Sequence, residues 1–234
     1  LITSEEETQL HIDMIEAAAA RGMEVVVFKP HPAAPPSQTG PLFEAAQRLG
    51  ITLQLFDLPV MAEVIIDRLA PDLIVGGFST ALMTARQIYQ VPALAVGTDL
   101  LLEAIAPYQN SNRIPLTIIS EICDGSAPDK TDAHPQLGRL LAAVSYCMAP
   151  TLSHDLRDAA TDFLTEVFEV STGRGESADR FSRYFKRRRL TALALPGSTS
   201  KAFAPKRMIK RSGTLVIKAV ARKQQRIMKR IQQR

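Results

Sequence analysis

The sequence predicts an α/β fold in which short parallel strands alternate with helices in one Rossmann-like sheet. Four apolar runs of strand length carry this prediction, at residues 23–29, 51–55, 72–76 and 92–96. Segments with a helical spacing of apolar residues lie between them. Strands that alternate with helices favour a parallel sheet with right-handed crossovers. A chain of 234 residues, 46% of them hydrophobic, is large enough to bury the core of such a domain.

The helices follow from capping and spacing signals. Ser4 and Glu7 have the spacing of a capping box, which predicts a first helix that begins at Ser4 and ends at Gly22. The pattern becomes helical beyond Gly97, so helices are expected both between the strands and after them, at residues 42–49, 61–69, 79–90, 136–148 and 153–169.

Charge divides the chain into an acidic body and a basic tail. Residues 180–234 contain 18 Lys and Arg and no Asp or Glu, whereas residues 1–179 contain 10 Lys and Arg and all 24 Asp and Glu. The polar, glycine-containing stretch 171–175 is typical of a boundary. We therefore predict a domain over residues 1–172 and a basic tail over residues 173–234.

The end of the tail has the pattern of a basic amphipathic helix. Its apolar residues gather on one side of a helical wheel, and they are Val216, Ile217, Val220, Ile227, Met228 and Ile231. Its basic residues gather on the other side, and they are Lys218, Arg222, Lys223, Arg226, Lys229 and Arg230. Such a tail meets an anionic surface, and the apolar stripe favours lipid over nucleic acid. We expect residues 180–234 to bind an anionic membrane; a solvated tail without a partner is the alternative.

Cys123 and Cys147 are the only cysteines, and their apolar neighbours favour ordinary buried thiols in a reducing compartment. The sequence has no Cys-x-x-Cys pair, no zinc spacing and no carboxylate cluster at a strand end, so no metal is expected. No apolar run approaches the roughly 18–20 residues that span a bilayer. No signal peptide is visible. Because the chain opens with Leu1 and not with Met, we expect it to be a piece of a longer protein.

The motif Lys29-Pro30-His31-Pro32 directly follows the first predicted strand. The carboxyl ends of the strands line the ligand crevice in an open parallel sheet. The flanking prolines stiffen the turn and hold the imidazole of His31 in place. His31 could donate a hydrogen bond to a phosphate or protonate a leaving group, and a structural histidine in a loop is the alternative. The other histidines, His11, His134 and His154, are interpreted as structural.

The motif Gly76-Gly77-Phe78-Ser79-Thr80 follows the third strand and opens a helix. A glycine turn lets a ligand approach the backbone closely, because no Cβ stands in the way. A helix N-terminus capped by Ser79 presents free N–H groups and a positive dipole end, which favour an anion. Ser79 that serves only as a helix cap is the alternative. Together with the histidine motif, these residues predict a phosphate site at the carboxyl edge of the sheet.

The pair of motifs resembles the bacterial sialyltransferases of GT-B fold, and within them the α-2,8-polysialyltransferase family. The likeness rests on residues 29–32, 76–82 and 144–150 and extends over about residues 1–170. It implies that the chain is the C-terminal, donor-binding half of the enzyme. It also implies that the catalytic base, an acidic residue of the N-terminal half-domain, lies outside this chain, so the chain alone is expected to be inactive.

The resemblance implies a CMP-sialic acid donor and no further cofactor. His31 would be the catalytic residue, contacting the donor phosphate and stabilising the departing CMP, and Ser79 and Thr80 would hold the same phosphate. Glu63 matches a glutamate that binds the cytidine ribose, although Met61 stands where the family has a proline. The donor-binding residues implied in this way are Lys29, Pro32, Glu63, Gly77, Ser79 and Thr80.

These inferences predict an inverting sialyltransferase or polysialyltransferase that transfers sialic acid from CMP-sialic acid to a glycan acceptor. It would be cytoplasmic and peripheral on the inner face of the membrane. One alternative is another CMP- or CDP-linked transferase of capsule synthesis, for Kdo or a polyol phosphate. Those enzymes tend to have an acidic residue where this chain has Phe78. The other alternative is a non-catalytic domain whose tail binds membrane or nucleic acid.

Overall fold

The computed structural model describes residues 2–30, 39–123, 136–168 and 180–198. In its first part strands and helices alternate, in the order α1 (Ser4–Ala19), β1 (Val25–Phe28), α2 (Thr39–Arg48), β2 (Thr52–Leu55), α3 (Ala62–Leu69), β3 (Ile74–Gly76), α4 (Thr80–Gln87) and β4 (Ala93–Ala95). Helices follow, namely α5 (Thr98–Ala104), α6 (Arg113–Ile122), α7 (Leu137–Met148), the short 3-10 helix η2 (His154–Leu156), α8 (Arg157–Phe168) and α10 (Arg187–Leu193).

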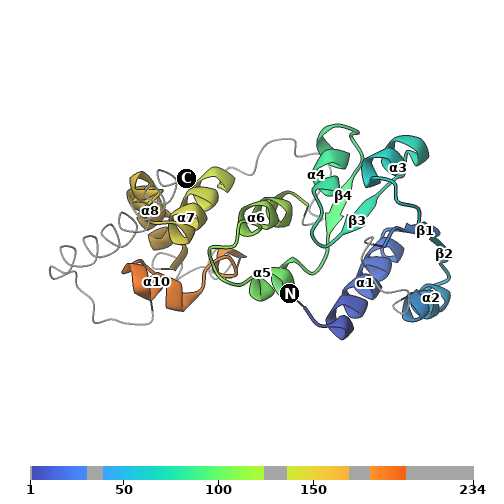
Figure 1. The fold of residues 1–234 in the computed structure, drawn as a ribbon, viewed down its shortest axis with the longest axis horizontal. Coiled ribbons are helices and arrows are strands. Elements are labelled where there is room, and N and C mark those ends of the chain that lie inside the picture. The colour runs from blue at the N-terminus through green and yellow to red at the C-terminus, as the bar shows by residue number, and fades with distance from the viewer. Residues whose placement is uncertain (1, 31–38, 124–135, 169–179, 199–234) are drawn as a thin grey trace, which may run out of the picture.

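The predicted mixed α/β class with parallel strands is confirmed, but the four strands do not form the single sheet that we expected. β1 pairs with β2, with Val25 opposite Thr52, and β3 pairs with β4, with Ile74 opposite Ala93. The two parallel pairs are separate two-stranded sheets because no ladder joins β1 to β3. Figure 1 shows both pairs in the half of the molecule that contains α1 to α4.

The first helix begins at Ser4, as the capping signal indicated, but its N-cap residue is Thr3 and not Ser4. Thr3 is the N-cap: its hydroxyl accepts from the Glu6 N–H at 3.2 Å, and the Glu6 carboxylate accepts from the Thr3 N–H at 2.7 Å. The sequence Thr-Ser-Glu-Glu-Glu fits the capping-box spacing in both registers, so spacing alone could not choose between Thr3 and Ser4.

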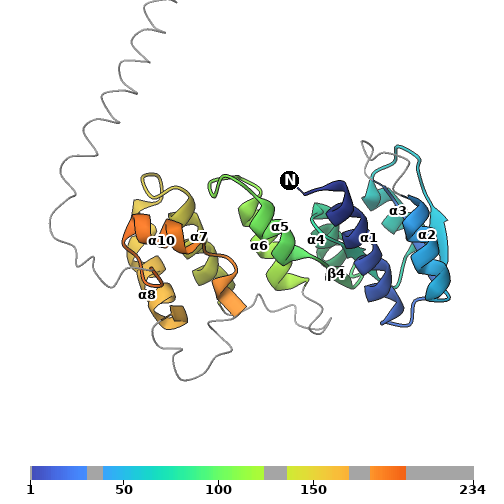
Figure 2. The same cartoon turned by 90° about the horizontal axis from the view of Figure 1, so that it is seen from below.

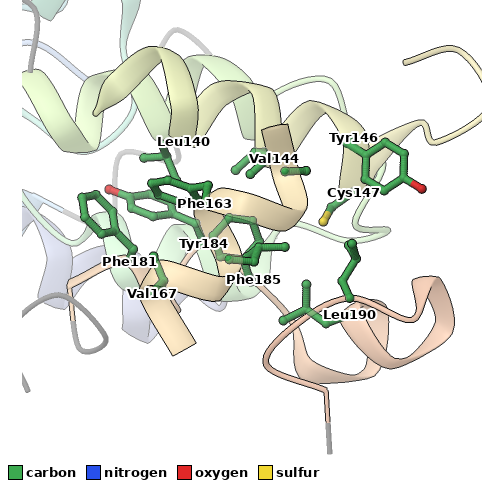
Figure 3. Close-up of a cluster of buried hydrophobic side chains, with 14 of the residues drawn as sticks. Leu140, Val144, Tyr146, Cys147, Phe163, Val167, Phe181, Tyr184, Phe185 and Leu190 are labelled. Carbon is green, nitrogen blue, oxygen red and sulfur yellow. The ribbon is translucent and has the colours of Figure 1, made fainter. Parts of the chain in front are cut away.

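The largest hydrophobic core lies in the helical half, between α5 and α10. Figures 1 and 2 both show this half beside the strand-containing half along the long axis. Figure 3 shows Leu140 and Val144 of α7 and Phe163 of α8 in contact with aromatic side chains from residues 180–185. The rings of Phe163 and Phe181 meet edge to face with centroids 5.4 Å apart.

Residues 180–198, which we had assigned to the basic tail, are part of this core. Phe181, Tyr184 and Leu190 are almost completely buried. Several cations of the segment bond to the protein itself: Arg180 and Arg183 pair with the buried Glu121, and Arg189 donates to the Cys147 carbonyl at 2.7 Å. Aromatic burial and a buried acidic partner therefore outweigh the preference of the Arg and Lys side chains for solvent. The amphipathic helix expected over 216–231 lies outside the described residues.

Cys123 and Cys147 are both buried, as predicted. Burial raises the pKa of the Cys147 thiol to about 12, and the nearby Arg189 cation offsets only part of this shift. None of the helices in the described ranges has the length and apolarity that a bilayer crossing requires.

Candidate functional site

The two sequence motifs reach the same cavity. This cavity has a volume of about 840 Å³ and lies between the β1–β2 and β3–β4 pairs. Lys29 and Pro30, which follow β1, line it, and so do Gly77, Phe78 and Ser79, which follow β3. We call these five residues the rim of the cavity. The parallel strands bring the two motifs together because both follow the carboxyl ends of their strands.

The N-terminus of α4 forms one side of the rim. Ser79 is the N-cap, and its hydroxyl accepts from the Ala81 N–H at 3.2 Å. The side chains of Ser79 and Thr80 are exposed, and the helix begins without an acidic residue in its first turn. Ser79 therefore caps α4, which is one of the two roles that the sequence left open. The positive end of the helix dipole is available to an anion.

Gly77 lies in a closely packed turn. A Cβ at Gly77 would lie 3.2 Å from Leu101 and 3.3 Å from Leu10 and Met14. Those contacts are tighter than side chains normally make, and they are made with the ends of the three side chains, so a larger residue would require those ends to shift by a few tenths of an ångström.

The other predicted site residues are not among those that line the cavity in the described part of the chain. His31 and Pro32 lie outside the described residues. Glu63 is in the first turn of α3 and is half-buried, but neither Glu63 nor Thr80 is among the residues that line the cavity. Of the predicted donor-binding residues, Lys29, Gly77 and Ser79 line the cavity.

His11, which is interpreted as structural from the sequence, lines this cavity. It lines the cavity from α1, and its ring meets that of Phe28 edge-on with centroids 5.1 Å apart. Its buried Nδ1 has no hydrogen-bond partner within the part of the chain that the structure describes. Burial lowers the pKa of His11, although the Glu7 carboxylate opposes the shift. The sequence shows only that Glu7 and His11 lie four residues apart on one helical face, and that spacing does not indicate a cavity.

The chemistry of the rim suits an anion better than a metal. It combines the Lys29 ammonium group with a helix N-terminus, and both attract negative charge. Across the described ranges, no group of three or more His, Cys, Asp or Glu side chains is arranged to hold a metal ion. A phosphate group is the ligand that these features fit.

Residues 1–98 match the model of one protein family, described as alpha-2,8-polysialyltransferase (POLYST). The matched range contains both strand pairs, α1 to α4 and every predicted site residue. It ends before residues 144–150, which also contributed to the resemblance seen in the sequence. No curated protein and no solved structure matches the chain. Over residues 1–98 the chain is thus similar to the alpha-2,8-polysialyltransferases, a family of glycosyltransferases, which confirms the resemblance drawn from its motifs.

Proposed function

We propose that this chain is the donor-binding half of an inverting GT-B sialyltransferase that takes sialic acid from CMP-sialic acid, and that the full enzyme extends polysialic acid on a glycan acceptor. The observation that carries the proposal is that Lys29, Gly77 and Ser79 line one cavity, within the range that matches the family. A cation and a helix N-terminus form a site for the single phosphate of CMP.

The rim would act on the leaving group. As the acceptor hydroxyl attacks the anomeric carbon, the bond to CMP breaks and negative charge grows on its phosphate. Lys29, His31 and the N-terminus of α4 would stabilise that charge, and Ser79 and Thr80 would fix the phosphate by hydrogen bonds. Removal of one such donor group typically lowers the rate by about 10²–10³-fold. Pro32 would stiffen the His31 turn, and Glu63 would bind the cytidine ribose from α3.

Two further parts of the enzyme would lie beyond the rim. The acidic base that activates the acceptor hydroxyl would belong to the N-terminal half-domain, so residues 1–234 alone would bind the donor without transferring sugar. Residues 199–234 would attach the enzyme to the cytoplasmic face of an anionic membrane, since they contain 12 Lys and Arg without an acidic residue. The six basic residues of 180–198 contribute less to that contact because most of them bond to the folded protein.

Calorimetric titration of the chain with four ligands tests the function. CMP is expected to bind at least about tenfold more tightly than cytidine, because only CMP brings a phosphate to the rim. UMP is expected to bind more weakly than CMP, because the family donor carries cytosine. The absence of CMP binding, or equal affinities for CMP and cytidine, would contradict the proposal.

CDP is the fourth ligand because it distinguishes a sialyltransferase from the main alternative, a transferase that uses a CDP-linked donor. A transferase of polyol phosphates releases CMP from a CDP-linked donor and must accommodate two phosphates, so its site would bind CDP more tightly than CMP. Phe78 at the rim is apolar and exposed, where those enzymes tend to have an acidic residue. That difference favours the sialyltransferase.

A further inference from the structure

Helix α1 reaches the carboxyl ends of both β1 and β3. His11 of this helix meets Phe28, the last residue of β1, with ring centroids 5.1 Å apart and an angle of 68° between the ring planes. Its neighbour Leu10 lies toward β3, where a Cβ added at Gly77 would come within 3.3 Å of the Leu10 side chain. One turn of α1 therefore reaches both strand ends that lead into the rim.

The imidazole of His11 brings one unused hydrogen-bonding atom to the cavity. His11 lines the cavity, and its Nδ1 is buried without a hydrogen-bond partner among the residues that the structure describes. A buried polar atom normally has a partner, and an exception calls for a physical explanation. A polar group of a bound ligand would supply that partner, and this sign of a ligand is independent of the rim residues.

The charges around His11 indicate an anion as the ligand group. Lys29 directly follows the ring that His11 contacts, and Ser79, the N-cap of α4, lines the same cavity. Of the acidic lining residues, Asp72 precedes β3 and lies at its amino end, whereas Glu7 is one turn before His11. Burial lowers the pKa of His11 and the Glu7 carboxylate opposes that shift, so an added anion would further favour a proton on the ring.

We propose that His11 binds phosphate, donating a hydrogen bond from Nδ1 to an oxygen of a phosphate group held at the rim. The rim would supply a cation and a helix N-terminus, and His11 would add a directional donor from α1. The inference rests on the proposed function for the source of that group, which would be the single phosphate of CMP. Free inorganic phosphate presents the same oxygen atoms.

Nitrogen NMR of the full chain with 15N-labelled histidine follows Nδ1 directly. The signals of His11 are identified as those that disappear in His11→Asn. CMP and inorganic phosphate are each expected to shift the Nδ1 resonance of His11, because each brings phosphate oxygens, whereas cytidine is expected to leave it in place. His154, which is exposed on η2, is the internal control, and its signals are expected to stay in place with all three ligands.

Two substitutions separate the nitrogen atom from the ring. His11→Phe keeps an aromatic ring against Phe28 and removes Nδ1, whereas His11→Asn removes the ring and keeps a polar nitrogen close to the former position of Nδ1. Calorimetric titration measures the affinities of both variants for CMP and cytidine. His11→Phe is expected to lower the CMP affinity by about tenfold and to leave the cytidine affinity unchanged. His11→Asn is expected to stay within about threefold of the parent for CMP.

Three results would overturn the inference. One is an Nδ1 resonance that stays in place with both CMP and inorganic phosphate. Another is an Nδ1 proton that already exchanges slowly with solvent in the ligand-free chain, which would assign this atom to a partner within the chain. The third is a His11→Phe chain that binds CMP as tightly as the parent.

The same measurements distinguish this inference from the proposed function. A chain whose Nδ1 resonance responds to inorganic phosphate but which does not prefer CMP to cytidine would support the phosphate contact and contradict the donor site. A chain that prefers CMP while the Nδ1 resonance stays in place would support the donor site and contradict the role of His11.

Discussion

The hydroxyl of Tyr184 donates a hydrogen bond to the Glu121 carboxylate at 2.5 Å, and this contact joins the segment 180–198 to α6. The side chain of Glu121 is fully buried, and Arg180 and Arg183 pair with its two oxygens at 3.0 and 3.3 Å. Two arginines that the charge pattern assigned to a surface tail are thereby held by one interior carboxylate. Residues 180–198 therefore belong to the folded unit.

Tyr184→Phe is expected to lower the free energy of unfolding by about 1–3 kcal/mol, because it leaves an oxygen of the buried Glu121 with one donor fewer. Tyr89→Phe is the control, since Tyr89 is only partly buried and packs beside Ile66 and Ala85. Its effect is expected to stay within about 0.5 kcal/mol. Urea unfolding of the two variants and the parent measures these changes in the free energy of unfolding. Equal stabilities of the two variants would show that the Tyr184–Glu121 contact does not hold the segment.

Stability is expected to fall at alkaline pH. The pKa of the Cys147 thiol is about 12 in the folded protein and near 9.0 when the thiol is exposed. The unfolded chain therefore loses this proton first, so the contribution of Cys147 is fully present below pH 9 and is lost as the pH rises toward 12. Burial also raises the pKa values of Tyr108 and Tyr184, which extends the loss above pH 10.

Urea unfolding at pH 7, 8, 9, 10 and 11 checks this dependence. The free energy of unfolding is expected to decline above pH 9 in the parent chain, and Cys147→Ala is expected to decline less between pH 9 and 10. A parent chain with constant stability up to pH 11 would contradict the assignment. So would a Cys147→Ala variant with an unchanged slope.

Gly97→Ala is expected to destabilise the protein by about 2–4 kcal/mol. Gly97 has φ +70°, and a Cβ there would overlap the Cδ1 atom of Leu10 on α1. Gly138→Ala is the control, because Gly138 lies within α7 and nothing stands within 4 Å of its added Cβ. The control is expected to gain about 0.5–1 kcal/mol from helix propensity. Thermal unfolding of the two variants and the parent measures these changes in stability. A Gly97→Ala protein as stable as the parent would refute the close contact with α1.

Binding to anionic vesicles is expected to require residues 199–234. Co-sedimentation with phosphatidylserine-containing vesicles compares the full chain with a chain that ends at residue 198, which keeps the packed segment 180–198 intact. The full chain is expected to sediment with anionic vesicles and not with neutral ones, whereas the shortened chain is expected to stay in solution. Equal sedimentation of the two chains would assign the contact to the folded part instead.

Local sequence signals predicted most elements of this fold. All four strands and the helices at 39–48, 62–69, 80–87, 137–148 and 157–168 lie where apolar periodicity and capping residues indicated. Lys29 and Ser79, which both follow predicted strands, line one cavity, and their role in donor binding stays a prediction.

Features that depend on distant contacts could not be predicted in this way. Strand patterns give no pairing partner, so they could not reveal that β1 and β3 stay apart. The charge count likewise placed Arg180 and Arg183 in a basic, membrane-binding tail, since nothing local marks Glu121 as a buried partner 59 and 62 residues away. The cavity position of His11 depends on how α1 crosses β1, which the sequence of α1 does not specify.

The most direct test of the donor site is the affinity of CMP relative to cytidine in His31→Ala and Ser79→Ala, measured by calorimetric titration of the full chain. Thr161→Ala is the control, because it removes a hydroxyl that bonds only within α8. The parent and Thr161→Ala are expected to prefer CMP by at least about tenfold, and both site variants are expected to lose most of that preference. If His31→Ala and Ser79→Ala keep the full preference for CMP, the phosphate does not bind at this rim and the central claim is wrong.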